Sequence, residues 1–201
     1  KPIFGPPCPP APLPPRAAAT PALAALRPPT SVQLIQDTFA ETIGAMAIIT
    51  DMDGRPVTRL SNPCGLFAAL ADVPDLMEMC VAHWQRMAGT IDLEPRFTEG
   101  SLGLLCARGF IRAGVELKGM VFVGGFAPDT WPPSPSRLAE MAAELRLPAA
   151  RLAPHVAEVY RLPPADRKRT LNLIQRVANI ISHLISERAE LPAAQPEEEP
   201  L

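Results

Sequence analysis

Apolar residues recur with a helical period at the start of the domain and with a shorter period further on. Val32, Ile35, Phe39 and Ile43 follow the spacing of an amphipathic helix, and Gly44 is typical of the residue that ends one. Two more helical patterns lie in "PCGLFAALA" and "VPDLMEMCVAHWQRMAGTI". Further helices are predicted by "SRLAEMAAELRL", "PHVAEVYRL" and "ADRKRTLNLIQRVANIISHLISERAEL".

Strands are predicted in two places. A short apolar run at about 45–50 ends in the turn "DMDG" and continues into a short extended piece, "RPVTRL". A long hairpin is predicted from the runs 104–113 and 117–126, which are rich in β-branched and aromatic residues and flank Gly114. Strands and helices are grouped rather than alternating. The fold class is therefore α+β, an antiparallel sheet flanked by helices.

The terminal helix, at about 165–191, carries a wide apolar stripe. Arg188 replaces one apolar position in it. A stripe of this width packs on its own domain more often than it forms a coiled-coil seam, so we expect docking on the sheet or helices first and homodimer formation second. The stripe consists of Leu173, Ile174, Val177, Ile180, Ile181, Leu184 and Leu191.

Composition divides the chain into three parts. Eleven of the 26 prolines lie in residues 1–29, which predicts an extended, largely polyproline II arm without a core of its own. Residues 192–201 contain three consecutive glutamates and predict a solvated acidic tail. The compact domain is expected between them, at residues 30–191.

The arm is predicted to bind another protein subunit. It cannot bury enough apolar area to offset the roughly 1–2 kcal/mol per residue that ordering a backbone costs. Polyproline segments lose less entropy on binding, because proline already fixes φ. We expect Ile3 and Phe4 to insert into an apolar pocket of the partner, with Leu13, Leu23 and Leu26 as further anchors. The alternative is a linker between domains.

Charge and cysteine usage exclude several classes. A net charge of −2 gives no footprint for nucleic acid, and no run of 18 apolar residues predicts a transmembrane helix. Cys8, Cys64, Cys80 and Cys106 lack Cys-x-x-Cys spacing, so we expect core residues in a reducing compartment, without a disulfide or a metal. The expected location is cytoplasmic, with peripheral contact with a membrane complex left open. Because the chain begins without Met or a signal peptide, we expect a processed chain or a fragment.

The turn "DMDG" is the strongest candidate for chemistry. Asp51 and Asp53 after an apolar strand resemble the nucleophile motif of haloacid-dehalogenase-type phosphatases, but the downstream lysine and acidic pair are missing. A calcium loop would need further oxygen ligands. A two-residue type I′ hairpin turn explains the same residues and is the favoured interpretation.

The sequence contains no other recognisable set of catalytic residues. Nucleophile-elbow, zinc-protease and phosphate-loop motifs are absent. We expect His83 at an interface or at the surface, and Arg108 and Arg112 on an exposed sheet face, with an anionic ligand as their alternative. The chain is predicted to be non-enzymatic and to use no cofactor.

Three segments together resemble the PocR-type sensory domain, a family regarded as a variant of the PAS fold. They are "LIQDTFAETIGAMAIITDMDGRPVTRLSNPCGLF", "EMCVAHW" and "GLLCARGFIRAGVELKGMVFVGGFAP", followed by the long terminal helix. The resemblance covers roughly residues 30 to 190. It implies a PAS-like sheet and a place upstream of kinases, cyclases or DNA-binding domains in bacterial regulators.

The resemblance also shows departures from the family pattern. Gly100 stands where members commonly carry a cysteine, while Gly103 and Leu104 agree, and Cys64 and Cys80 fall near two other cysteines. Phe110 replaces a proline and Phe126 replaces a glutamine. If the replaced residues line the family's pocket, a small polar ligand would meet a filled, apolar cavity here.

Two functions follow as expectations. The first is an accessory, structural or interaction subunit of a larger assembly; the alternative is a signal-transduction sensor that binds a small, mainly apolar ligand and signals through its C-terminal helix. Any cavity between the sheet and its covering helices is predicted to carry at most one or two polar groups; the alternative is a plain packed core. The predicted lining is Met46, Ile48, Leu105, Phe110, Met120, Phe122 and Phe126.

Overall fold

The computed structural model describes residues 30–90 and 92–190, without the side chains of residues 188–190. The predicted arm at residues 1–29 and the acidic tail at residues 192–201 therefore lie outside the described residues. The partner-binding roles of Ile3, Phe4, Leu13, Leu23 and Leu26 stay predictions.

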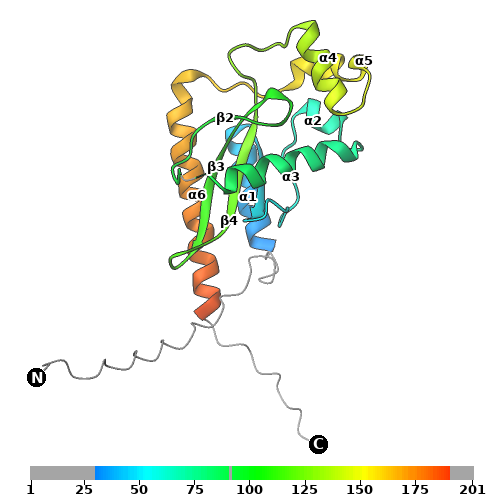
Figure 1. The fold of residues 1–201 in the computed structure, drawn as a ribbon. Helices are drawn as coiled ribbons and strands as arrows, with labels where there is room; N and C mark the ends of the chain where they lie inside the picture. The colour runs from blue at the N-terminus through cyan, green and yellow to red at the C-terminus, as the bar shows by residue number, and fades with distance from the viewer. Residues whose placement is uncertain (1–29, 91, 191–201) are drawn as a thin grey trace, which may run out of the picture.

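The described chain folds as α+β, as the grouping of its patterns predicts (Figure 1). A short extended piece after β1 joins that strand only through isolated bridges, such as Ala47 to Ser61. The sequence patterns did not predict β2 or α5. The elements are α1 Thr30–Ile43, β1 Met46–Asp51, α2 Gly65–Ala69, α3 Pro74–Ala88, β2 Thr98–Glu99, β3 Leu105–Ala113, β4 Glu116–Phe126, α4 Pro135–Glu144, α5 Ala149–Leu152 and α6 Pro164–Glu190, with 3-10 turns at Ser101–Gly103 and Ala153–Glu158.

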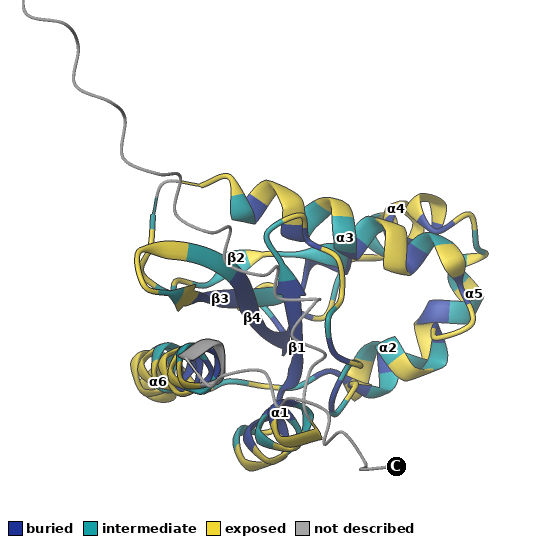
Figure 2. Ribbon diagram, turned by 90° about the horizontal axis from the view of Figure 1, so that it is seen from below, coloured by how far each residue is buried: buried dark blue, intermediate teal, exposed yellow. Residues whose placement is uncertain are grey.

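The sheet has four antiparallel strands in the order β1-β4-β3-β2. Figure 2 shows α1 and α6 on one side of it, and α2, α3, α4 and α5 on the other. Because side chains alternate along a strand, β1, β3 and β4 each contribute to two separate cores, one on each face. The two cores are distinct clusters of buried residues.

The terminal helix docks on the sheet, which confirms the first of the two expectations for its apolar stripe. α6 packs mainly against β3, with Ile174 and Ile181 fully buried. Ile180, which would widen the stripe, is 49% exposed. Among the described residues, no helix is both long and apolar enough to cross a membrane.

The α6 face of the sheet is closely packed because its strands carry small residues there. Ala107 and Gly109 of β3 lie under the helix. A Cβ added at Gly109 would lie 3.0 Å from the Cβ of Ala178 and 3.2 Å from Ile174 Cγ2. The backbones of strand and helix approach so closely that a side chain at this position has no room.

Candidate functional site

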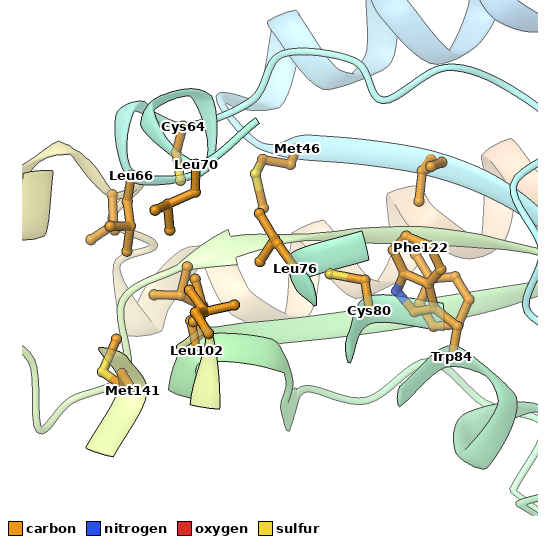
Figure 3. Packing of buried hydrophobic residues seen from close by; sticks show 14 of the residues in the cluster. Met46, Cys64, Leu66, Leu70, Leu76, Cys80, Trp84, Leu102, Phe122 and Met141 are labelled. Atoms are coloured by element: carbon orange, nitrogen blue, oxygen red, sulfur yellow. The ribbon is translucent and has the colours of Figure 1, made fainter. Parts of the chain in front are cut away.

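A cavity of about 350 Å³ lies on the other face, between the sheet and helices α2 and α3. Part of its floor is the row Met46, Gly124 and Cys106, three paired residues on neighbouring strands. Its roof is α3, from which Leu76 and Cys80 line the space (Figure 3). This volume falls within the range of small-molecule sites in proteins.

Two features leave this space open: a residue without a side chain in the floor, and an aromatic contact between α3 and the sheet. Gly124 has no side chain, and a Cβ there would lie 2.8 Å from the Cβ of Cys106. Along the sheet, Trp84 of α3 packs on Phe122 of β4 with ring centroids 5.5 Å apart. We attribute the space to this aromatic pair, which separates α3 from the strands and leaves the row of Met46, Gly124 and Cys106 beside it uncovered.

The lining is apolar except at one end. Ala68, Ala71 and Met77 are exposed residues of the lining, so the mouth lies beside α2 and the start of α3. Of the polar lining side chains, His83 contacts Cys106, so its part of the wall faces β3. A molecule inside would therefore contact mostly carbon and sulfur, with a polar patch at one end.

His83 and Cys106 form the centre of this polar patch. Their Nε2 and Sγ atoms are 3.4 Å apart. On the other side of the ring, Arg86 Nη2 lies 3.5 Å from His83 Nδ1. Cys106 Sγ also lies 4.0 Å from both Thr98 Oγ1 and Met87 Sδ.

Both groups of this pair are held in their neutral forms. Burial raises the pKa of the Cys106 thiol to about 11. Burial, and then the charge of Arg86, lowers the pKa of His83 below its ordinary value of 6.5. A thiolate–imidazolium pair, as found in cysteine nucleophiles, would require both shifts to run the opposite way.

Gly100 bears on the missing cysteine of the family pattern. A Cβ added at Gly100 would lie 2.9 Å from Cys106 Sγ and 3.6 Å from His83 Nε2. The thiol of Cys106 therefore lies where a side chain at position 100 would point. A thiol is therefore still present at this place in the wall, but it comes from Cys106 on β3 and not from position 100.

Four of the seven predicted lining residues are brought together in the cavity. Met46, Ile48, Leu105 and Phe122 line it. Two others, Phe110 and Met120, are buried in the core on the same face of the sheet but are not part of the lining. The last one lies elsewhere.

Phe126 belongs to the core on the opposite face. It meets the ring of Phe97 edge-on, with centroids 5.8 Å apart. Alternation places residues 122 and 126 on one face, but β4 is irregular at Gly125, which has φ +82°. The extra residue in the ladder reverses the faces beyond it, so Phe126 points away from Phe122.

The expectation of an exposed face for Arg108 is wrong. Arg108 is 3% exposed and donates from Nε to the carbonyl of Met87 at 2.9 Å and from Nη2 to that of Asp92 at 2.9 Å. It also bonds Thr90 Oγ1 and lies over the ring of Phe110, 4.2 Å from its centroid. The guanidinium thus satisfies carbonyls at the end of α3 and in the segment that follows it. These bonds use Nε and Nη2 and hold the side chain inside the domain.

The turn after β1 is confirmed, but its length is three residues and not two. Asp51 N donates to Arg55 O at 2.9 Å, and Gly54, with φ +75°, completes the turn. The Asp51 carboxylate accepts the N–H groups of Asp53 at 2.9 Å and Arg55 at 2.8 Å. In the described part of the chain, no group of three or more His, Cys, Asp or Glu residues is placed to hold a metal ion.

The sequence interpretation missed the polar side of the cavity. A usable signal existed on α3, because Leu76, Cys80, His83 and Trp84 recur every three or four residues on one face. Cys106 gave no signal, since its place depends on the pairing of β3 with β4.

Comparison with known protein families finds one match, to the sensory domain found in PocR, over residues 29–186. Neither the curated proteins nor the solved structures contain a match. The match covers more than half of the chain and includes the elements described above, except for the last four residues of α6. The chain belongs to the family of PocR sensory domains.

Proposed function

We propose that this domain is a sensor that reversibly binds a small, mainly apolar molecule in the cavity under α3 and signals through α6. The observation that carries the proposal is the 350 Å³ space itself, with its apolar lining, in a domain of a sensory family. Sequence patterns favoured an accessory subunit; the cavity favours the sensor.

Hydrophobic burial would supply the affinity. A ligand in the cavity loses contact with water over most of its surface, at about 25 cal/mol per Å² of apolar area. The cost of association is smaller in a space that already exists than in one that must be opened.

The route to α6 is short. Cys106 and Gly124 form part of the cavity floor, while the next residues along the strands, Ala107 and Val123, face the α6 side. A ligand that shifts the floor of the cavity would therefore act on α6 through the thickness of a single sheet.

Binding, and not catalysis, fits the one Cys–His pair that lines the cavity. Its thiol is kept protonated by burial, which raises the Cys106 pKa to about 11. A protonated thiol is a poor nucleophile at neutral pH. The pair is then a recognition element in the wall.

The test is a variant that fills the cavity. Cys80→Phe places a ring in the lining, and Ala82→Phe, on the exposed side of the same helix, is its control. With ethylbenzene as probe, we expect calorimetry to give a dissociation constant of about 1 mM or tighter for the wild type and the control. Cys80→Phe should bind at least about tenfold more weakly. Unchanged binding by Cys80→Phe would mean that the probe binds elsewhere.

The same samples test the signal. Ethylbenzene should slow hydrogen exchange in α6 of the wild type and leave it unchanged in Cys80→Phe. Absence of any change in α6 at saturation would contradict the proposed output.

A further inference from the structure

The polar end of the cavity contains a hydrogen-bond donor with a poor partner. Two lining residues carry a ring N–H, His83 and Trp84, and His83 is the one at the polar patch; among the described residues the partner of its Nε2 is the Sγ of Cys106, at 3.4 Å. A thiol sulfur accepts hydrogen bonds only weakly. An oxygen placed beside Nε2 would be a better acceptor than the sulfur already there.

The neighbour on the other side of the ring determines which nitrogen carries the proton. Arg86 lies 3.5 Å from Nδ1, and a guanidinium can only donate. Nδ1 therefore acts as the acceptor. In a neutral ring the proton is then on Nε2, which points to Cys106 at the cavity wall.

The thiol does not lose its environment if an oxygen takes the His83 donor. Cys106 Sγ keeps Thr98 Oγ1 and Met87 Sδ, each at 4.0 Å. Exchange of partners at Nε2 therefore leaves no buried group newly unsatisfied.

The wall also selects against charge. No Asp, Glu, Lys or Arg belongs to the lining within the described chain, and besides His83 its polar side chains are Ser101, Trp84 through its indole N–H, and the two thiols. Arg86 approaches the far side of the imidazole and not the cavity. An ionised group inside would lose its hydration without a paired charge in return.

Taking the proposed function as its basis, we propose that the ligand is an uncharged molecule with an apolar body and one oxygen acceptor, a ketone, ether or alcohol, held by Nε2–H of His83. The cavity of about 350 Å³ has the volume of roughly a dozen water molecules at about 30 Å³ each. The ligand therefore has on the order of ten non-hydrogen atoms. Trp84 and Phe122 give one side of the wall an aromatic surface.

Three probes of one shape test this proposal on the full chain. Ethylbenzene has no oxygen, acetophenone adds a carbonyl oxygen, and benzoate carries an ionised group. Because the probes differ in their own hydration, the measured quantity is the ratio of acetophenone to ethylbenzene affinity in each variant. Dissociation constants come from calorimetry at pH 7.5.

His83→Leu removes the donor and keeps an apolar side chain, while His83→Gln supplies an N–H group again. We expect the ratio to fall about tenfold in His83→Leu, because the carbonyl oxygen is then left unsatisfied, and to recover in His83→Gln. Cys106→Ser offers His83 a stronger internal acceptor and should lower the ratio, whereas Cys106→Ala should keep or raise it. Thermal unfolding of each variant confirms that it is folded.

The outcomes separate this inference from the proposed function. If ethylbenzene binds and Cys80→Phe abolishes its binding, but the ratio is the same in wild type and His83→Leu, the cavity is a ligand site and the role of His83 is wrong. If benzoate binds more tightly than acetophenone, the uncharged class is wrong. If neither neutral probe binds, the proposed function fails and this inference fails with it.

Discussion

The two faces of the sheet are built from the same four strands but serve different ends. On the α6 face, Ala107 and Gly109 let the helix lie close to the strands, and Ile174 and Ile181 are fully buried. On the α3 face, Trp84 and Phe122 hold the helix away, and a cavity of about 350 Å³ remains. Small residues under a close helix make a rigid contact; small residues beside an aromatic spacer make a cavity.

This difference separates binding from output within one sheet. The cavity can exchange its contents without loss of the fold, because a packed core lies on each face of the sheet around it. Because α6 packs closely on the other face, we expect a rearrangement of the cavity floor to shift this helix.

Truncation should cost more on the packed face. Ile181→Ala removes a fully buried side chain and should lower the free energy of unfolding by about 2–5 kcal/mol, since a new void forms. Leu76→Ala, in the cavity wall, should cost about 1–2 kcal/mol less, because part of its surroundings is already empty. Urea unfolding followed by circular dichroism measures both. Equal losses would mean that the two faces are equally well packed.

An added methyl group on the α6 face should lower the free energy of unfolding, because strand and helix lie so close together there. Gly109→Ala places its Cβ 3.0 Å from Ala178 and should cost about 1–3 kcal/mol of unfolding free energy. Gly89→Ala is the control, since its Cβ meets nothing nearer than 3.7 Å and its φ is −79°. The control should be neutral or slightly stabilising. A tolerated Gly109→Ala would contradict the rigid contact.

On the cavity face, the corresponding overlap should be relieved by one further substitution. Gly100→Ala brings a Cβ within 2.9 Å of Cys106 Sγ and should cost about 1 kcal/mol. Combined with Cys106→Ala, most of that cost should disappear, as a coupling of at least about 0.5 kcal/mol in a double-mutant cycle. Additive losses would show that the thiol is not what fills this place.

The smallest expected effect is a pH dependence of stability that belongs to the cavity face. The pKa of His83 is lowered by burial, then by Arg86, so the folded state favours the neutral ring. Its contribution is complete above the ordinary value of 6.5 and is lost as pH falls below it. Melting temperatures at pH 7.5 and 5.5 should therefore differ less in His83→Gln than in the wild type.

A separate group controls for acid effects on the other side of the molecule. Hydrogen bonds from Ser61 and then Gln33 lower the pKa of Asp37 on α1 below 3.8, so its contribution is lost only at lower pH. The comparison between pH 7.5 and 5.5 therefore reports on His83 and not on Asp37. An unchanged difference between pH 7.5 and 5.5 in His83→Gln would show that other groups cause it.

Sequence patterns predicted the parts of the fold that depend on local periodicity. The hairpin, the helix stop at Gly44 and the docking of α6 follow from alternation, a left-handed glycine and a wide apolar stripe. The face of Phe126 did not follow, because one extra residue at Gly125 reverses the alternation. The PAS-like description of the sheet stays an implication of the family resemblance.

The cavity was predictable in composition but not in extent. Alternation placed Met46, Ile48 and Phe122 on one face, but the empty volume depends on how far an aromatic pair lifts a helix, and no periodicity encodes that distance. The burial of Arg108 was missed for a related reason. Two of its partners are main-chain carbonyls, which are the same in every sequence.

Arg108 also makes the two ends of α3 differ in how firmly they are held. Its bonds to Met87 and Asp92 fasten the C-terminal end of the helix to the sheet. At the other end, the Arg146–Asp75 ion pair, 3.5 Å long and with an exposed arginine, contributes little resistance. The two ends of the cavity roof are therefore held differently: polar bonds from Arg108 hold the C-terminal end, while apolar packing of Leu76 and an exposed ion pair hold the N-terminal end beside the mouth at Met77. We expect hydrogen exchange to be faster at the N-terminal end of α3 than at its C-terminal end.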